Sequence, residues 1–381
     1  MTDPARMILL LSLCFLLCLP ASLSGNRSGV QCISCGAFIG LEKAGGTFLC
    51  GCGYETDLAS CDETVPTAST GGFFGAYNRL SRFEVDDNGF GDPTSERVMF
   101  SFRLYNGSHR GGGIVFRPEL YEDGQGRQET RYFLYLTIGD QFRYETAQDI
   151  QGNLEGVTIR VAVNVEPDGL GGWTCPPDTH VPTHVYSTQP PLNHEADELS
   201  GQWYCIPDDN PWAGQPGYFE EFCSLGHRNP HRLALDPVTN LMWSGEIGQS
   251  TREEINIIEC GNNYGWPFRE GLVAGVRTPP SSSAGTLTDP VIAFTRDESR
   301  AIIGGDVYRG TRYPELYGRY IAGDYVFGNI WAITLDESTM TATKEYLTDF
   351  SPGGLGTFGQ DKDGEVYLGD VIAGSTLWQL D

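Results

Sequence analysis

Residues 304–335 read GGDVYRGTRYPELYGRYIAGDYVFGNIWAITL, and this stretch decides the fold. An apolar segment at 304–308 is followed by a turn rich in Gly, Pro and Tyr, and a second apolar segment ends in Gly-Asp at Asp324. A third apolar segment covers 329–335. Short apolar segments separated by turn residues are typical of strands, and they are too short for helices. The stretch therefore predicts three consecutive antiparallel strands.

The same phrase occurs three more times along the chain. Each copy has an apolar strand, a Pro/Asp/Gly turn, a second apolar strand ending in Gly-Asp or a similar pair, a short loop and a third apolar strand. The copies cover 112–116, 132–140 and 157–161; 231–237, 241–248 and 254–258; and 355–358, 364–370 and 376–380. Repeated units of this kind are the signature of a β-propeller, whose blades have four strands. An irregular stretch at 166–222 interrupts the series, and a loop that long is usually functional or an insertion.

The composition supports an all-β fold with many turns. Glycine makes up 49 of 381 residues, whereas only 20% of residues are charged and 40% are hydrophobic. This mixture excludes a coiled coil, a disordered tail and a helical bundle.

The net charge of −25 limits the partners of the protein. An acidic surface repels phosphate backbones and anionic lipid, so nucleic acid is not expected as a partner. Metal ions and cationic ligands are favoured, although acidity by itself often serves only solubility.

The N-terminus predicts secretion. The apolar run Ile8–Leu19 follows Arg6, is too short to span a bilayer, and precedes small residues that suit a signal peptidase. We therefore expect a signal peptide at 1–24, an extracellular protein, and no membrane span after cleavage. A Cys/Gly-rich segment with little strand pattern follows at 25–72, and the propeller is expected over 75–381.

The cysteines are expected to form disulfides in that oxidising compartment. Cys175 and Cys205 flank the irregular stretch and are predicted to pair, and a second predicted pair is Cys223 with Cys260. Zinc is the alternative for the Cys-x-x-Cys and Cys-x-Cys spacings at Cys32–Cys52, and a second zinc alternative joins Cys175 to nearby histidines. The sequons at Asn26 and Asn106 are candidate glycosylation sites.

A series of motifs resembles the glucose/sorbosone dehydrogenase family, in order and in spacing, from about residue 75 to 381. The matching segments are Arg79–Phe83, Ser95–Val98, His109–Phe116, Leu136–Asp140, Ala147–Asp149, Ile206–Pro211, Leu225–Pro230, Gly248–Gln249, Glu253–Asn256, Asn262–Pro267, Gly305–Gly310 and Pro314–Tyr320. The family contains soluble PQQ-dependent glucose dehydrogenase, aldose sugar dehydrogenases and the propeller of Hedgehog-interacting protein.

The resemblance implies a six-bladed propeller, here missing most of its first blade, because the Cys-rich segment stands where the family has further strands. It also implies two competing functions. One is oxidation of an aldose at its anomeric carbon with PQQ and calcium. The other is a non-catalytic propeller that binds an extracellular protein or a glycan.

The resemblance also assigns roles to a small set of polar residues. His109 would be the general base, Asp140 would orient its imidazole, and Gln148 would contact substrate. The structural alternatives are a turn-capping histidine and a Gly-Asp turn residue. Arg228 and Asn229 would polarise the quinone carbonyls, although Arg228 could instead bond main-chain carbonyls.

The implied calcium ligands are mostly carbonyl oxygens, as a hard cation requires. The carbonyls of Gly248 and Gln249 would hold the calcium that bridges to PQQ, and Glu254 and the Tyr264 carbonyl would hold a second, structural calcium. The alternative for Glu253 and Glu254 is a solvated strand end. Two regions that carry basic clamps for PQQ in the dehydrogenases, 353–359 and 324–328, contain no Lys or Arg here, which favours the binding protein.

Overall fold

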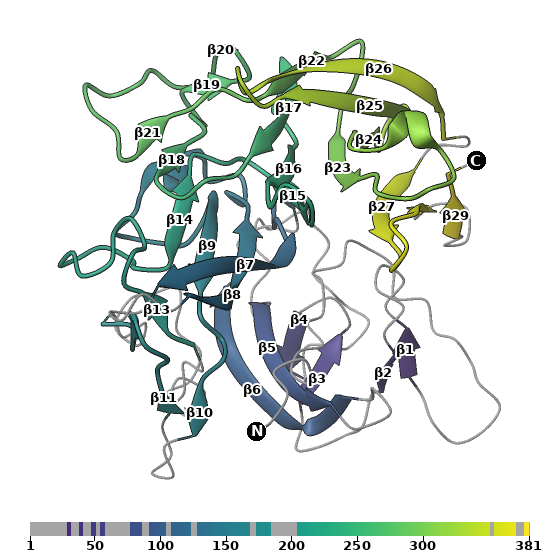
Figure 1. Cartoon of the computed structure of the whole chain (residues 1–381). Helices are drawn as coiled ribbons and strands as arrows, with labels where there is room; N and C mark the ends of the chain where they lie inside the picture. Colours follow the sequence, from purple (N-terminus) through teal and green to yellow (C-terminus); the bar gives the residue numbers. More distant parts are fainter. Residues whose placement is uncertain are drawn as a thin grey trace. The chain divides into compact units, whose positions relative to one another are not determined.

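The computed structural model describes residues 29–31, 38–40, 47–50, 54–57, 77–85, 91–103, 108–122, 128–167, 173–183, 204–350, 354–370 and 377–380. Strands dominate these residues, and their helices are two short 3-10 turns, η3 (Tyr144–Gln148) and η5 (Pro314–Leu316) (Figure 1). The all-β fold is therefore confirmed. Within the same residues, no helix is both long and apolar enough to cross a bilayer.

The chain divides into two compact units. The first unit comprises Met1–Gly107 with Ala162–Asp208, and the second comprises Ser108–Val161 with Asp209–Asp381. All the candidate site residues belong to the second unit.

In its described residues, the first unit contains one four-stranded antiparallel sheet and three two-stranded ones. The larger sheet has the order β3 (Thr47–Cys50), β4 (Tyr54–Asp57), β5 (Tyr77–Val85), β6 (Gly91–Arg103). The pairs are β1 (Gly29–Gln31) with β2 (Phe38–Gly40), β10 (Glu166–Pro167) with β11 (Trp173–Thr174), and β12 (Thr179–His180) with β13 (Ile206–Pro207). Within 25–72 the described residues form short strands, which a sequence with little strand pattern does not announce because three or four residues are too few to show periodicity.

The second unit contains the sheets that the repeated phrase predicts. Each copy of the phrase forms three consecutive antiparallel strands, as expected. The strands are β7 (Ile114–Glu122), β8 (Gln128–Ile138) and β9 (Val157–Val161); β15 (Pro230–Leu235), β16 (Met242–Glu246) and β17 (Arg252–Ile257); β23 (Ile302–Val307), β24 (Tyr320–Asp324) and β25 (Asn329–Asp336); and β27 (Leu355–Gln360), β28 (Val366–Asp370) and β29 (Leu377–Gln379).

Further strands extend three of these sheets. The outer strands are β14 (Phe222–Leu225), β18 (Asn262–Asn263) and β21 (Thr286–Leu287) beyond β9, β22 (Ile292–Thr295) beside β17, and β26 (Thr341–Asp349) beside β25. A separate hairpin joins β19 (Arg269–Glu270) to β20 (Val273–Ala274). Two sheets thus have the four strands of a propeller blade, while the number of blades and the loss of the first one stay predictions.

Glycines allow successive sheets to pack closely. A Cβ added to Gly245 would lie 2.3 Å from the Gly304 nitrogen, and one added to Gly113 would lie 2.3 Å from the Leu233 nitrogen. The first strands of neighbouring sheets are accordingly in contact, β7 with β15, β15 with β23, and β23 with β27. The high glycine content therefore serves sheet-to-sheet packing as well as turns. Apolar clusters fill the spaces between these sheets, with Trp243, Phe294 and Tyr320 in one and Ile321, Leu355 and Phe358 in the next.

A buried carboxylate at the end of each second strand explains the repeated Gly-Asp ending. Asp324 Oδ1 accepts the amide protons of Arg300 at 2.6 Å and Ala301 at 2.7 Å, which lie just before β23. Glu246 Oε1 does the same for the amides of Arg228 and Asn229 before β15, at 2.7 and 2.6 Å. Each carboxylate therefore fixes the chain that enters the first strand of its sheet.

Both predicted disulfides are present. Cys175 pairs with Cys205 in the first unit, and Cys223 pairs with Cys260 in the second. The Cys175 thiol is therefore not available as a zinc ligand. The signal peptide, the zinc alternative at Cys32–Cys52 and the two sequon asparagines concern positions outside the described residues. Cys50, the last residue of β3, and Ser108, the third residue of the second sequon, are described.

Candidate active site

His109 and Asp140 form the central pair of the site. Nδ1 of His109 lies 2.6 Å from Oδ1 of Asp140, and both side chains are buried. Asp140 follows β8 in the same way that Glu246 and Asp324 end the second strands of their sheets. Those two carboxylates accept amide protons from the chain before the first strand, whereas Asp140 accepts from the His109 side chain there. Oδ2 of Asp140 accepts the indole proton of Trp266 at 2.8 Å. Because an ionised carboxylate only accepts, Nδ1 of His109 carries the proton and Nε2 has the free lone pair.

The backbone around this pair is strained. Six non-glycine residues in the described part of the chain have left-handed φ values, and three of them meet here: His109 at 54°, Gln141 at 49° and Phe142 at 64°. The amide of Gln141 donates to the His109 carbonyl at 3.2 Å, and the amide of Phe142 donates to Asp140 Oδ1 at 2.9 Å. Left-handed conformations are costly for such residues and gather at functional sites. The clustering favours a functional site over a simple turn.

Burial keeps His109 neutral near physiological pH. Desolvation lowers the pKa of His109 below its ordinary 6.5, and the positive charge of Arg228 lowers it further. The hydrogen bond and the charge of Asp140 act in the opposite direction but do not outweigh burial. A neutral imidazole whose Nε2 is unprotonated is the form that a general base requires.

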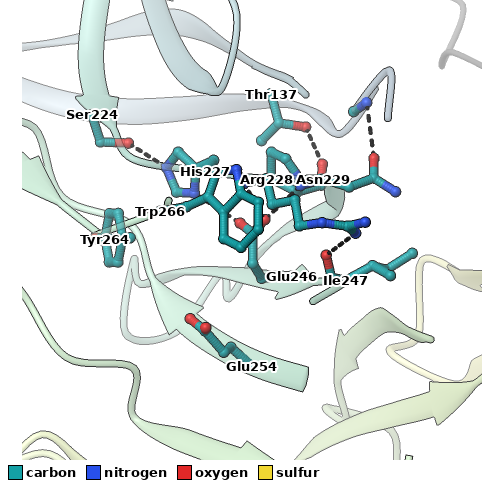
Figure 2. Close-up of polar contacts among 12 residues, drawn as sticks. Thr137, Ser224, His227, Arg228, Asn229, Glu246, Ile247, Glu254, Tyr264 and Trp266 are labelled. Atoms are coloured by element: carbon teal, nitrogen blue, oxygen red, sulfur yellow. Dashed lines mark hydrogen bonds and ion pairs between the residues drawn. The ribbon is translucent and has the colours of Figure 1, made fainter. Parts of the chain in front are cut away.

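Arg228 lies beside the pair and is held by neutral groups. The Asp140 amide donates to the Arg228 carbonyl at 2.8 Å, which joins the two segments. The guanidinium donates from Nε and Nη2 to Gln249 Oε1 at 3.0 and 2.5 Å. Its Nη1 donates to the Ile247 carbonyl at 2.9 Å (Figure 2). These side-chain bonds end on uncharged acceptors, while the charges of Asp140 and Glu246 act on the guanidinium without a hydrogen bond to it. The main-chain bond to Ile247 also agrees with the structural alternative for Arg228.

Asn229 follows Arg228 in the chain, and Gln249 accepts from the Arg228 guanidinium. Oδ1 of Asn229 accepts the Gly111 amide at 3.4 Å, which links the glycines after His109 to the start of β15. Oε1 of Gln249 also accepts the hydroxyl proton of Tyr144 at 3.2 Å. The structure thus brings His109, Asp140, Arg228, Asn229 and Gln249 into one connected set from four segments of the chain.

Gly248 is fixed through its amide. That amide donates to Oε2 of Glu253 at 3.2 Å, and the same oxygen accepts the Ile302 amide at 3.1 Å. Oε1 of Glu253 pairs with Arg296. Glu253 therefore connects Gly248 to β23, while the predicted metal-binding role of the Gly248 and Gln249 carbonyls stays a prediction.

Glu253 and Glu254 are both buried, so the alternative of a solvated strand end is wrong for each of them. The Glu254 carboxylate accepts the amide proton of Gly271. Burial, and secondarily the neighbouring charge of Glu246, raises the pKa of Glu254 to about 8. On the same face of β17, the fully buried Asn256 interacts with the Glu254 carboxyl through its side-chain amide, and its Oδ1 has no hydrogen-bond donor. A cation would satisfy both the carboxylate and the orphaned amide oxygen.

Tyr264 lies near these acidic residues without a demonstrated metal. Its hydroxyl donates to the Ile257 carbonyl at 2.5 Å, and its ring stacks on His227. Among the described residues, no group of three or more His, Cys, Asp or Glu side chains could hold a metal ion. The predicted calcium sites use one carboxylate and main-chain carbonyls, so this finding leaves them as predictions.

Gln148 is placed differently from its expected role. Its side chain donates to Asn263 Oδ1 at 3.0 Å and to the Trp266 carbonyl at 2.6 Å, and it accepts from Asn263 Nδ2 at 2.8 Å. These bonds tie η3 to the segment 263–266. The contact of Gln148 with substrate stays a prediction, and its bonds favour a structural role.

Two residues of the site were not singled out from the sequence. Trp266 lies within the motif Asn262–Pro267, but its bond to Asp140 joins positions 126 residues apart and has no local signal. Phe142 stacks on the His109 ring, with 3.6 Å between ring centroids. Its only sequence signal is its position two residues after Asp140.

His227 lies at hydrogen-bond distance from Glu246 and Ser224, and these distances alone resemble those of a hydrolase triad. His227 Nδ1 lies 2.9 Å from Glu246 Oε2, and His227 Nε2 lies 3.0 Å from Ser224 Oγ (Figure 2). His227 and Ser224 are fully buried, and Glu246 nearly so. A nucleophile must be reached by substrate, so this set serves to hold the start of β15 in place.

The sequence comparisons agree with the resemblance. Residues 203–376 match the family model described as "Glucose / Sorbosone dehydrogenase". HIPL2 protein of Arabidopsis thaliana is 27% identical over 317 residues, covering 73% of this chain and 40% of that protein. Aldose sugar dehydrogenase YliI of Escherichia coli is 27% identical over 280 residues, covering 72% of this chain and 59% of that protein.

The structural comparison establishes the fold alone. A solved structure named glucose dehydrogenase aligns with a TM-score of 0.56 at 23% identity, over 82% of this chain and 75% of that one. The chain spans only about two fifths to three fifths of the length of the curated relatives it matches.

Proposed function

Since residues 203–376 belong to the glucose/sorbosone dehydrogenase family, we propose that this protein is a secreted sugar dehydrogenase that oxidises an aldose at its anomeric carbon, with PQQ and calcium. Its propeller has six blades in this proposal, of which the first is largely absent. Two disulfides support an oxidising, extracellular location. The single observation that carries the proposal is the His109–Asp140–Trp266 set beside the buried guanidinium of Arg228.

The residues divide the chemistry among them. Nε2 of His109 takes the proton of the anomeric hydroxyl, and Asp140 stabilises the imidazolium that results. When bound, PQQ supplies a hydride acceptor and calcium supplies a Lewis acid beside it. Arg228 and Asn229 would supply positive charge and hydrogen-bond donors that stabilise negative charge on the quinone oxygens. Burial of His109 and Arg228 strengthens these interactions because water is excluded.

The fit of the cofactors differs between their two ends. The buried cation of Arg228 suits the carbonyl end of a quinone, and Glu254 with Asn256 suits a calcium ion. At the carboxylate end, β27 offers no Lys or Arg over Leu355–Gln360. PQQ carboxylates would therefore lack the charge that the dehydrogenases supply from this region.

The alternative is a non-catalytic propeller, like that of Hedgehog-interacting protein, that binds an extracellular protein or a glycan. The missing basic clamp favours it. The HIPL2 protein and the aldose sugar dehydrogenase are equally identical to this chain, so sequence similarity does not separate the two functions.

Dye-coupled oxidation of aldoses by the purified protein, supplied with PQQ and calcium, tests the proposal. His109→Ala should lower the rate by about 10² to 10⁴, the usual contribution of a positioned base. His180→Ala is the matched control, because His180 Nδ1 also lies 2.6 Å from a carboxylate, Asp208, but in the first unit and partly exposed. Equal, measurable rates in wild type and His109→Ala would remove His109 as the base, whereas a wild type that oxidises no aldose would favour the binding protein.

A further inference from the structure

Phe142 covers the candidate base. The two rings stack with 3.6 Å between centroids and 29° between planes. His109 is only 5% exposed, whereas Phe142 is 42% exposed. A molecule that approaches His109 from the side of Phe142 therefore meets the phenyl ring first.

The position of this ring is set by an unfavourable backbone. Phe142 has a φ of 64° and follows Gln141, whose φ is 49°. The Phe142 amide is held by Asp140 Oδ1 at 2.9 Å, and the Gln141 amide by the His109 carbonyl at 3.2 Å. Glycine would adopt this conformation without cost, so a bulky residue here indicates that the side chain has a use.

The surroundings of the ring suit a sugar. An exposed aromatic face offers apolar surface to the C–H face of a pyranose, and the nearby polar groups can orient its hydroxyls. The Arg228 guanidinium lies 5.7 Å from the Phe142 ring centroid, and His109 lies directly beneath the ring. We propose that Phe142 is a substrate-contacting specificity residue, on which the sugar ring packs, and that its stack also fixes the orientation of the His109 imidazole.

This inference rests on the proposed function for its substrate, but not for the positioning of His109. The charged groups that face His109 are Asp140, Arg228 and Glu246. With these left in place, removing the phenyl ring would readmit water to one face of the imidazole. The pKa of His109 should then rise toward its ordinary 6.5, because desolvation is the largest cause of its depression.

The variants separate the ring from the backbone. Phe142→Gly removes the ring and relieves the left-handed strain, and Phe142→Tyr keeps the aromatic stack. Met340→Gly is the control for strain relief, because Met340 has a φ of 52° in the turn between β25 and β26. Phe327→Ala is the control for an exposed Phe beneath an arginine, since Arg300 lies 4.9 Å from its ring centroid.

Two readouts are measured. The first is NMR titration of the His109 ring protons in protein without cofactor, assigned by comparison with His109→Ala. We expect a higher pKa for His109 in Phe142→Gly, and wild-type values in Phe142→Tyr, Met340→Gly and Phe327→Ala. The second is the KM for D-glucose with PQQ and calcium, which should rise by about 2- to 10-fold in Phe142→Gly, as expected for a lost aromatic contact.

The outcomes of the two readouts decide different parts of the proposal. An unchanged titration of His109 in Phe142→Gly overturns the positioning role, and an unchanged KM overturns the specificity role. If the wild type oxidises no sugar, the proposed function fails separately, and titration of the cofactor-free protein with D-glucose decides the contact. Glucose-induced shifts at His109 that are lost in Phe142→Gly support the contact, and their absence in wild type overturns it.

Discussion

Replacing Asp140 by asparagine should damage both the stability and the activity of this protein. Three donors converge on the Asp140 carboxylate: the His109 ring at 2.6 Å, the Phe142 amide at 2.9 Å and the Trp266 indole at 2.8 Å. An asparagine offers a single oxygen, so its own NH₂ group must face either the Trp266 indole or both the His109 ring and the Phe142 amide. A buried donor left without an acceptor costs about 1–3 kcal/mol. We expect that loss in the free energy of unfolding, measured by urea titration.

The effect on activity depends on which donor is abandoned. If the amide oxygen turns toward Trp266, the NH₂ group faces Nδ1 of His109. Nδ1 must then accept, and the proton moves to Nε2, which can no longer act as a base. If the oxygen stays on His109, the negative charge that stabilises the imidazolium is still lost. Both arrangements predict a fall of about 10² to 10⁴ in kcat.

Asp324→Asn is the matched control for this prediction. Asp324 is also fully buried, ends β24 as Asp140 follows β8, and accepts from the amides of Arg300, Ala301 and Phe327 at 2.6, 2.7 and 2.5 Å. Its substitution should cost a similar free energy of unfolding without the loss of kcat. The reasoning is refuted if Asp140→Asn retains kcat within about threefold of wild type, or if both variants lose activity equally.

Four further predictions concern pH, charge and metal. The kcat/KM of the proposed sugar oxidation should fall on acidification below pH 6.5, with its midpoint below the ordinary pKa of His. The depressed pKa keeps His109 unprotonated down to that point, so a midpoint above 6.5 would contradict this prediction. The same depressed pKa makes the free energy of unfolding depend on pH, because below about pH 6.5 the unfolded chain takes up the His109 proton before the folded chain does. The folded protein should therefore lose stability between pH 7.5 and 5.5. Urea titrations of wild type and His109→Ala at these two pH values measure that loss. Arg228→Lys should weaken PQQ binding, measured by quinone absorbance, by about 10-fold or more. The reason is that an ammonium group cannot reproduce the three hydrogen bonds of the guanidinium to Gln249 and Ile247. Unchanged binding would show that Arg228 is only structural. Removing calcium with a chelator should lower the Tm of wild type but not the Tm of Glu254→Gln. Glu145→Gln, which breaks an exposed ion pair, is the control and should respond as wild type does. An equal fall in Tm for Glu254→Gln would place the ion elsewhere.

Local sequence determined the strands of the repeated unit and both disulfides in the described residues. Apolar segments of strand length, such as 132–140 and 329–335, alternate with turns, and this pattern is a property of neighbouring residues. Cys175 and Cys205 could be paired because they flank one irregular stretch. The short hairpins at 47–57 escaped prediction because three or four residues are too few to show a period.

The resemblance selected the polar residues of the site, but tertiary structure alone decided which of them act together. His109, Asp140, Arg228 and Trp266 lie on four separate segments, and the packing of neighbouring sheets through close glycine contacts brings those segments together. Gln148 has the expected position in the chain, yet its side chain is bound to Asn263 and Trp266. Phe142 carries no motif, yet it covers the base. Sequence patterns record periodicity and turn chemistry over a few residues, whereas hydrogen bonds between distant side chains depend on how whole sheets pack, and that packing is not encoded in any local pattern.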